Sequence, residues 1–272
     1  MQSSLEVFFV SDRTGITAEA LGRSLLTQFD EDSRNYTVLP YIDTAEKIAG
    51  VIKQINAVKK NNGHVIVFSS LSNENHRQQL INNDFFVLDL FATCLPPLQS
   101  ALQQQSSPAI GQTHGIRDHA QYLTRMEAVN FALNVDDGLQ TKNYQQAEII
   151  LVGVSRSGKT PTCLYLAMQF GIRAANYPLL DEDLESGALP TVLKPWKNKL
   201  YGLVIDPDSL HRIRQARLPD SRYASLEQCR KEIKLLQNIY RQEQVTVVES
   251  SNMSVEELAT SLMHKAGLRR QF

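Results

Sequence analysis

The chain has 272 residues and a formal net charge of −1, and 42% of its residues are hydrophobic while 21% are charged. This length exceeds the usual single-domain size, so we expect two domains with separate cores. The near-neutral charge gives no reason to expect a nucleic-acid partner, and the absence of long apolar runs or a signal peptide predicts a cytoplasmic protein without membrane spans.

Strand-like and helix-like segments alternate over the first hundred residues. Strands are predicted at 7–10, 36–41, 64–68 and 85–91, and helices at 18–29, 45–60 and 74–81. Strands that alternate with helices indicate a parallel sheet with helical crossovers. The sequence therefore predicts an N-terminal parallel-sheet α/β domain over residues 1–105.

A polar loop follows the first predicted strand and contains Ser11, Asp12, Thr14 and Gly15. Parallel sheets bind their ligands beyond the carboxyl ends of the strands, and this loop is the first such end. It could receive a phosphate or a substrate side chain. An ordinary capped loop before the next helix is an equally good interpretation.

The composition changes after residue 105, where glutamine, serine, proline and glycine replace the regular alternation. We therefore predict a linker and connecting helix over 106–144, with the helix at about 119–134. The helix stops at Asp136, Asp137 and Gly138. The two adjacent carboxylates could hold a metal ion or accept a proton, although an Asp-Asp-Gly turn is also a common end of a helix.

The most specific motif lies at the start of the predicted C-terminal domain, residues 145–272. It matches the phosphate-binding pattern G-x-x-x-x-G-K-[ST] with Gly153, Val154, Ser155, Arg156, Ser157, Gly158, Lys159 and Thr160. An apolar strand at 149–152 precedes the motif and a helix at 161–170 follows it, as the pattern requires. The sequence thus predicts a P-loop kinase-like α/β domain that binds a nucleotide.

Each residue of this loop has a predicted task. The backbone amides would surround a diphosphate at the helix N-terminus, Lys159 would reach the terminal phosphates, and the Thr160 hydroxyl would hold Mg²⁺. Arg156 either neutralises the transferring phosphoryl group or is simply solvated.

Further elements complete the predicted catalytic domain. Strands are expected at 174–177, 200–205 and 245–248, and helices at 209–217, 226–240 and from 255 onwards. The strand at 200–205 ends in Asp206, and P-loop folds use such an aspartate beside Mg²⁺ and the attacking oxygen. Asp206 is therefore predicted to act as general base or metal ligand, with a turn residue before proline as the alternative.

Together these residues resemble the bifunctional kinase/pyrophosphorylases, a family that regulates phosphoenolpyruvate synthase or pyruvate, phosphate dikinase. The resemblance spans nearly the whole chain and is densest over 153–178, with further agreement at Ser11-Asp12, Thr14-Gly15, 131–138 and 202–207. The blocks 113–115 and 221–225 look more like the synthase regulators than the dikinase regulators. Arg13 and Cys163 depart from the usual pattern in small ways.

The resemblance implies a reaction that the residues alone do not. ADP would phosphorylate a threonine of phosphoenolpyruvate synthase and inactivate it, and inorganic phosphate would remove the group as pyrophosphate. Lys159 and the loop amides would stabilise the transferring group in both directions. Asp206, or alternatively Asp136 or Asp137, would accept the threonine proton.

Two other functions remain open at this level. The same loop occurs in ATP-dependent small-molecule kinases, although the large N-terminal domain argues against that class. A nucleotide-sensing module that binds its partner without transferring phosphate is the other alternative. The sequence leaves the oligomeric state open, with a homodimer as one option.

Overall fold

The computed structural model describes residues 5–30, 33–62, 64–106 and 119–271, and divides the chain into two compact units, 1–117 and 118–272. The division falls inside the predicted linker. The predicted connecting helix is part of the second unit, which therefore begins before the predicted boundary at residue 145. Both units are α/β, as the alternation of strands and helices predicted.

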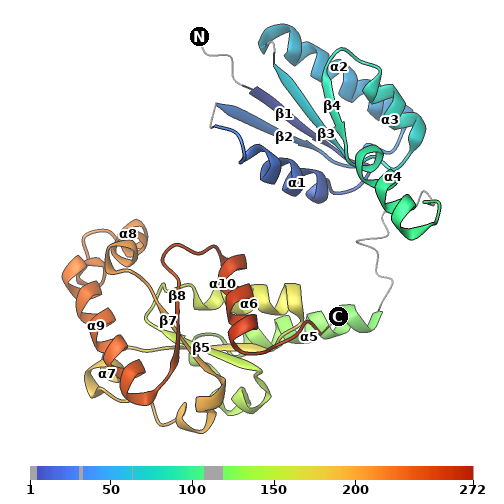
Figure 1. Ribbon diagram of the computed structural model, residues 1–272. Helices are drawn as coiled ribbons and strands as arrows, with labels where there is room; N and C mark the ends of the chain where they lie inside the picture. The colour runs from blue at the N-terminus through green and yellow to red at the C-terminus, as the bar shows by residue number, and fades with distance from the viewer. Residues whose placement is uncertain (1–4, 31–32, 63, 107–118, 272) are drawn as a thin grey trace. The chain divides into compact units, whose positions relative to one another are not determined.

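The first unit contains a four-stranded parallel sheet with strand order β2-β1-β3-β4. Its elements in chain order are β1 (Leu5–Val10), α1 (Ile16–Leu26), β2 (Arg34–Leu39), α2 (Ala45–Asn62), β3 (Val65–Ser69), α3 (Glu74–Ile81), β4 (Phe86–Asp89) and α4 (Leu90–Leu102). Alternate residues of β1 face opposite sides of the sheet. Phe8 and Val10 pack with residues of α2 and α3, whereas Val7 and Phe9 pack with residues of α1 and α4. Figure 1 shows α1 and α2 on opposite sides of this sheet.

The second unit repeats this arrangement with strand order β6-β5-β7-β8, again all parallel. Its strands are β5 (Ile149–Gly153), β6 (Ala174–Pro178), β7 (Leu200–Val204) and β8 (Thr246–Glu249). Its helices are α5 (His119–Asn134), α6 (Lys159–Phe170), α7 (Asp181–Ser186), α8 (Pro207–Arg217), α9 (Leu226–Glu243) and α10 (Val255–Lys265), with short 3-10 turns η1 (Asp136–Gly138), η2 (Thr141–Gln146), η3 (Lys194–Lys199) and η4 (Arg222–Ala224).

Helices cover both faces of the second sheet, so β5 is buried along its whole length. Ile149 and Leu151 pack in one core cluster with residues of α5, α6 and α10. Ile150 and Val152 pack in the other, which includes residues of α7, α8 and α9. A strand that is apolar on both faces is typical of a parallel sheet between two helical layers.

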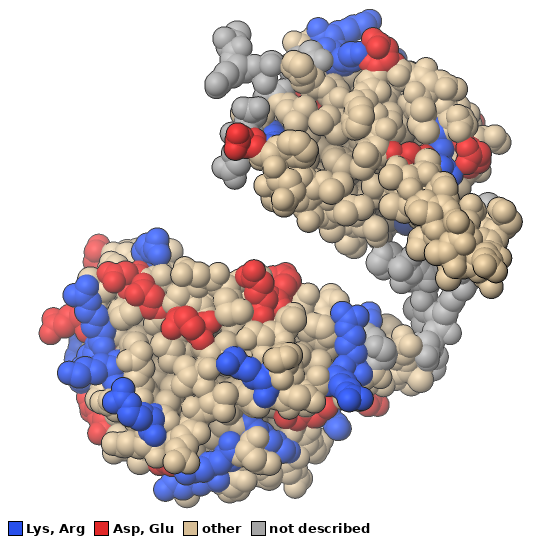
Figure 2. All heavy atoms as spheres, viewed as in Figure 1, with Lys and Arg blue, Asp and Glu red and all other residues tan. Residues whose placement is uncertain are grey.

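Two helices were not predicted from the sequence. Helix α4 contains Pro96 and Pro97, residues that normally disfavour a helix interior. Helix α7 lies between two predicted strands, in a segment for which no element was predicted, and the acidic residues of its first turn suit the positive end of a helix. The face shown in Figure 2 carries both acidic and basic side chains on each unit, so neither sign of charge covers it.

Candidate functional site

The phosphate-binding motif forms a tight turn between β5 and α6. Gly158 is the N-cap of α6 with a φ of 91°, in the left-handed region that glycine adopts at least cost. A Cβ atom on Gly153 would lie 2.8 Å from the Ser157 hydroxyl oxygen and 3.0 Å from the Leu203 carbonyl oxygen. Gly158 is thus required by its backbone conformation, and Gly153 by the close packing around it.

Lys159 is the first residue of α6 and is only 5% exposed, so its side chain is buried and does not face solvent. Its Nζ donates a hydrogen bond to the Val154 carbonyl oxygen at 2.9 Å, across the loop. Burial lowers the pKa of Lys159 to about 8, and the nearby carboxylates of Asp137 and Asp136 partly oppose this shift. A buried cation held by one carbonyl would gain strongly from an incoming anion.

A cavity of about 280 Å³ opens on the helix side of the loop. It is lined by seven residues, six of them from the motif and the start of α6: Asp137, Ser155, Arg156, Gly158, Lys159, Thr160 and Pro161. Arg156 has a φ of 75°, which is unusual for a residue with a side chain. The cavity thus combines two cations, one carboxylate and the N-terminal end of a helix.

Asp137 reaches this cavity through contacts made by its neighbour Asp136. The Asp136 Oδ1 atom accepts hydrogen bonds from the Thr160 hydroxyl at 2.8 Å and from the Asn176 amide at 2.5 Å. The Asn176 Oδ1 atom in turn accepts from the Asp137 backbone N–H at 3.1 Å. These bonds fix η1 against the start of α6, and Asp137, with a φ of 49°, lines the cavity.

Asp206 lies in a different environment. Its carboxylate accepts a hydrogen bond from the Ser209 backbone N–H at 2.9 Å and caps α8. It is not among the residues that line the cavity. The structure therefore brings Asp137 to the loop, and it places Asp206 at the N-terminus of α8, where its carboxylate caps the helix.

The residues around Thr160 are chemically suited to Mg²⁺. Magnesium prefers oxygen ligands and is usually held by one or two carboxylates together with substrate phosphates. The Thr160 hydroxyl and the Asp136 carboxylate are already in contact, and Asp137 is adjacent. Within the described residues, no group of three or more His, Cys, Asp or Glu side chains lies together as a metal site of protein ligands alone.

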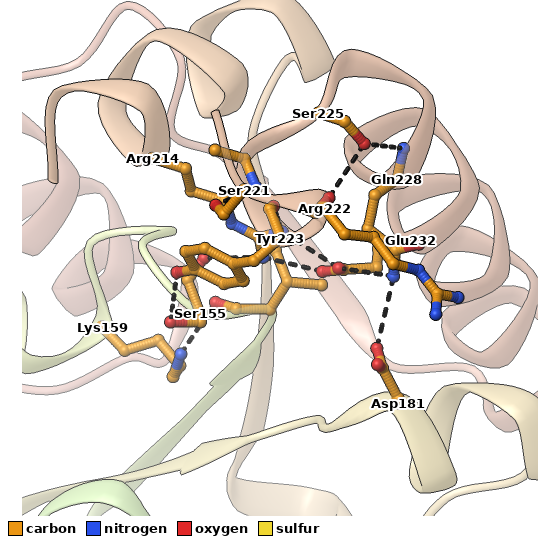
Figure 3. Close-up of polar contacts among 12 residues, drawn as sticks. Ser155, Lys159, Asp181, Arg214, Ser221, Arg222, Tyr223, Ser225, Gln228 and Glu232 are labelled. Atoms are coloured by element: carbon orange, nitrogen blue, oxygen red, sulfur yellow. Dashed lines mark hydrogen bonds and ion pairs between the residues drawn. The ribbon is translucent and has the colours of Figure 1, made fainter. Parts of the chain in front are cut away.

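Residues that the motif did not identify hold the strand side of the loop in place. Arg214 is 1% exposed, and its guanidinium forms a two-point ion pair with Glu232 at 2.9 and 2.7 Å (Figure 3). The same guanidinium donates to the Ser155 carbonyl oxygen at 3.1 Å, and the Tyr223 hydroxyl donates to the Ser155 hydroxyl oxygen at 3.0 Å. In the sequence, only the resemblance of the block 221–225 to the synthase regulators pointed to this region.

A second and larger cavity, of about 510 Å³, shares Ser155 with the first. It lies among β6, α7, α8, η4 and α9. Its lining residues are Ser155, Leu179, Leu180, Asp181, Glu182, Arg214, Arg222, Tyr223, Gln228 and Glu232. The two cavities differ in composition. The smaller contains two cations and one carboxylate, whereas the larger contains two arginines and three carboxylates together with apolar, aromatic and amide side chains.

The polar loop of the first unit is held by hydrogen bonds to serines that follow β3. Ser11 and Asp12 are buried, and Asp12 accepts hydrogen bonds from the backbone N–H of Ser72, at 2.8 Å, and from its hydroxyl. Ser11 accepts a hydrogen bond from the Ser70 hydroxyl at 3.0 Å. Gly15 is the N-cap of α1 with a φ of 80°. Thr14 is partly buried, and residues 113–115 lie outside the described part of the chain.

Comparison with known proteins agrees with this arrangement. A sequence model described as kinase/pyrophosphorylase matches residues 7–263. The chain belongs to the kinase/pyrophosphorylase family. A curated relative from Stutzerimonas stutzeri strain A1501 is 49% identical over 265 residues, which cover 97% of each chain. Another from Pseudomonas aeruginosa strain LESB58 is 48% identical over 273 residues and covers both chains completely.

Both relatives are provisionally named phosphoenolpyruvate synthase regulatory proteins. A third from Pseudomonas fluorescens strain Pf-5 has the same name and is 48% identical over 266 residues. Membership of a kinase/pyrophosphorylase family indicates a phosphoryl-transfer enzyme, as the loop had predicted. Across the described parts of the chain, every helix is too short or too polar to cross a bilayer.

Proposed function

We propose that this protein regulates phosphoenolpyruvate synthase by reversible phosphorylation of a threonine, with ADP as donor and inorganic phosphate as acceptor. The observation that carries the proposal is the presence of buried Lys159 and of Asp137 in one cavity beside the phosphate loop. A cation suits the transferring phosphoryl group, and a carboxylate suits the proton of the attacking hydroxyl. The names of the full-length relatives support the choice of target.

The ADP reaction needs one bond to form and one to break. The threonine oxygen attacks the β-phosphorus of ADP, the bond from that phosphorus to the α–β bridging oxygen breaks, and AMP leaves. Asp137 takes the threonine proton. Lys159 leaves the Val154 carbonyl and, with the loop amides and Arg156, stabilises the charge on the phosphoryl oxygens.

The reverse regulatory reaction uses the same loop. An oxygen of inorganic phosphate attacks the phosphothreonine phosphorus, the bond to the threonine oxygen breaks, and pyrophosphate forms. The protonated Asp137 returns its proton to the threonine oxygen. Inorganic phosphate is itself a nucleophile, so this direction depends on positioning more than on activation.

Magnesium would be held by Thr160 together with Asp136 and the substrate phosphates, and would supply further neutralisation of phosphate charge. We place the base at Asp137, although Asp206 was the first choice from the sequence. The reason is proximity: a general base must lie within hydrogen-bonding distance of the proton that it accepts, and Asp137 shares the cavity with Lys159.

The direct experiment is incubation of the purified protein with purified phosphoenolpyruvate synthase and either ADP or ATP. Mass spectrometry should detect a phosphothreonine with ADP and not with ATP, and added phosphate should remove it with release of pyrophosphate. Pyruvate, phosphate dikinase serves as the control target. Labelling of the dikinase in preference to the synthase, or a strict requirement for ATP, would contradict the proposal.

A further inference from the structure

The larger cavity has no task in the reaction described so far. It holds about 510 Å³, a volume within the range of small-molecule sites, and it meets the phosphate loop at Ser155. Its position beside the loop suggests that it receives a part of a substrate whose phosphate lies in the smaller cavity. The candidates are the nucleoside of ADP and a segment of the target protein.

In-line phosphoryl transfer decides between these candidates. The attacking and leaving oxygens lie on opposite sides of the phosphorus, so acceptor and leaving group must occupy different spaces. Asp137, the proposed base, lines the smaller cavity and is absent from the lining of the larger one. The threonine therefore approaches on the Asp137 side, and the leaving group departs toward the larger cavity.

The lining of the larger cavity suits a nucleoside. Tyr223 offers an aromatic ring, whose hydroxyl donates to the Ser155 hydroxyl oxygen and whose ring centroid lies 4.1 Å from the Arg214 guanidinium carbon. These contacts hold the ring in one orientation, as a stacking surface for a base requires. Leu180 adds an apolar side chain that is 59% exposed and can contact a bound nucleoside.

Polar groups are placed around these apolar ones. The Gln228 amide nitrogen donates to Glu232 at 3.1 Å and to Asp181 at 3.5 Å, so a primary amide lies inside the cavity (Figure 3). An amide can pair with the edge of a base, and carboxylates such as Asp181 accept hydrogen bonds from ribose hydroxyls. Arg222, also in the lining, provides a cation for the α-phosphate.

We propose that this cavity is the subsite for the adenosine monophosphate portion of ADP, which becomes the leaving group. The inference rests on the proposed function, and it adds a prediction that the function alone does not make. The two reactions share the target protein and the phosphate loop, but only the ADP reaction involves a nucleoside. Damage to the cavity should therefore impair phosphorylation and spare phosphate-dependent dephosphorylation.

Leu180→Glu is the test variant, because Leu180 is exposed and its replacement removes no core packing. The added charge would repel the α-phosphate and remove an apolar contact with the nucleoside. We expect the KM for ADP to rise about tenfold or more, while the rate of dephosphorylation by inorganic phosphate changes less than about twofold. Leu218→Glu is the matched control, since Leu218 is 53% exposed and lines neither cavity.

A binding measurement separates failure of this inference from failure of the proposed function. Calorimetric titration with AMP and with pyrophosphate needs no target protein and no catalysis. We expect Leu180→Glu to weaken AMP about tenfold and to leave pyrophosphate unchanged. Equal loss of both reactions with unchanged AMP binding would assign the cavity to the target protein and overturn the inference. The absence of any effect of Leu180→Glu would also overturn it. If Leu180→Glu weakens AMP binding as expected but the wild-type protein does not phosphorylate the synthase, the proposed function is refuted instead.

Discussion

The two units contain loops of the same length and backbone plan that are followed by different residues. Each loop has five residues, 11–15 and 154–158, follows the first strand of a parallel sheet, and ends in a glycine with positive φ that caps a helix. In both sheets that first strand is flanked by the second and third strands. The next residue is Lys159 in the second unit and Ile16, 58% exposed, in the first.

This difference shows that the backbone of a phosphate loop is not enough to assign chemistry. The first loop has the turn and the helix N-terminus but no ammonium group after the glycine. Its carboxylate, Asp12, is already bonded to Ser72. The second loop adds a buried cation and a nearby carboxylate to the same turn, so the proposed catalysis belongs to the second unit.

The largest effect should come from Lys159→Ala. Loss of the ammonium group should reduce both reactions at least about a thousandfold, because it stabilises charge on the transferring group in each direction. Transfer from β-labelled ADP to the synthase measures one direction and pyrophosphate release the other. Lys159→Met, which keeps the buried stem, controls for packing, and circular dichroism should show a native fold for both. Normal labelling by either variant would show that the Lys159 ammonium group does not stabilise the transferring group.

Asp137→Asn should lower phosphorylation about a hundredfold, since the amide cannot accept the threonine proton. Asp206→Asn is the matched comparison, because asparagine caps a helix as well as aspartate does and the charge is the main change. We expect Asp206→Asn to retain most of the activity in single-turnover assays. A larger loss in Asp206→Asn than in Asp137→Asn would restore Asp206 as the base.

The two capping glycines should respond differently to alanine. A Cβ on Gly15 would lie 2.9 Å from Val38 Cγ1, whereas the nearest atom to a Cβ on Gly158 is 3.9 Å away. Gly158→Ala should therefore cost about 1–2 kcal/mol of stability from left-handed strain alone, and Gly15→Ala about 3 kcal/mol because overlap is added. Hydrogen exchange resolved by unit measures both losses. Equal losses would mean that Val38 moves aside.

The affinity for pyrophosphate should depend on pH through Lys159. The pKa of this lysine is about 8 in the free protein, and a bound anion raises it. Below pH 8 the Lys159 ammonium group is charged in both the free protein and the complex, so it contributes no pH dependence to the affinity. Above that value binding must take up a proton, so affinity falls by up to about tenfold per pH unit until the pKa of the complex is reached.

Titration of the wild type and of Lys159→Met over the same pH range isolates this contribution, because the ionisation of pyrophosphate itself is common to both proteins. The difference between the two curves should appear above pH 8. Parallel curves would show that the lysine does not change its protonation on binding.

The smallest effect is expected from Asp12→Asn in the first unit. The substitution keeps an acceptor for Ser72 but removes a charge from the loop, so we expect a change of about threefold in the KM for the synthase and an unchanged kcat. Steady-state kinetics with varied synthase concentration measures this. A fall in kcat comparable to that of Asp137→Asn would place the first loop in the chemistry and end the contrast between the two loops.

The sequence by itself determined the elements that depend on neighbouring residues. The phosphate loop, its strand and its helix were all predicted, because glycine positions, apolar periodicity and the lysine lie within one short segment. The alternation of strands and helices likewise predicted the N-terminal parallel sheet and a C-terminal α/β domain. Helices α4 and α7 were not predicted. Pro96 and Pro97 disfavour the interior of α4 locally, and α7 has only six residues.

Only the tertiary structure decided which distant residues meet at the loop. Strand order brings η1 to the start of α6 through Asn176 on β6, and so places Asp137, the proposed base, at the cavity. Arg214 and Tyr223 lie 59 and 68 residues from Ser155 along the chain, yet both bond to it. Periodicity predicts which face of an element is buried but not which element covers it. The identity of the base and the existence of the second cavity therefore depend on topology and not on local sequence.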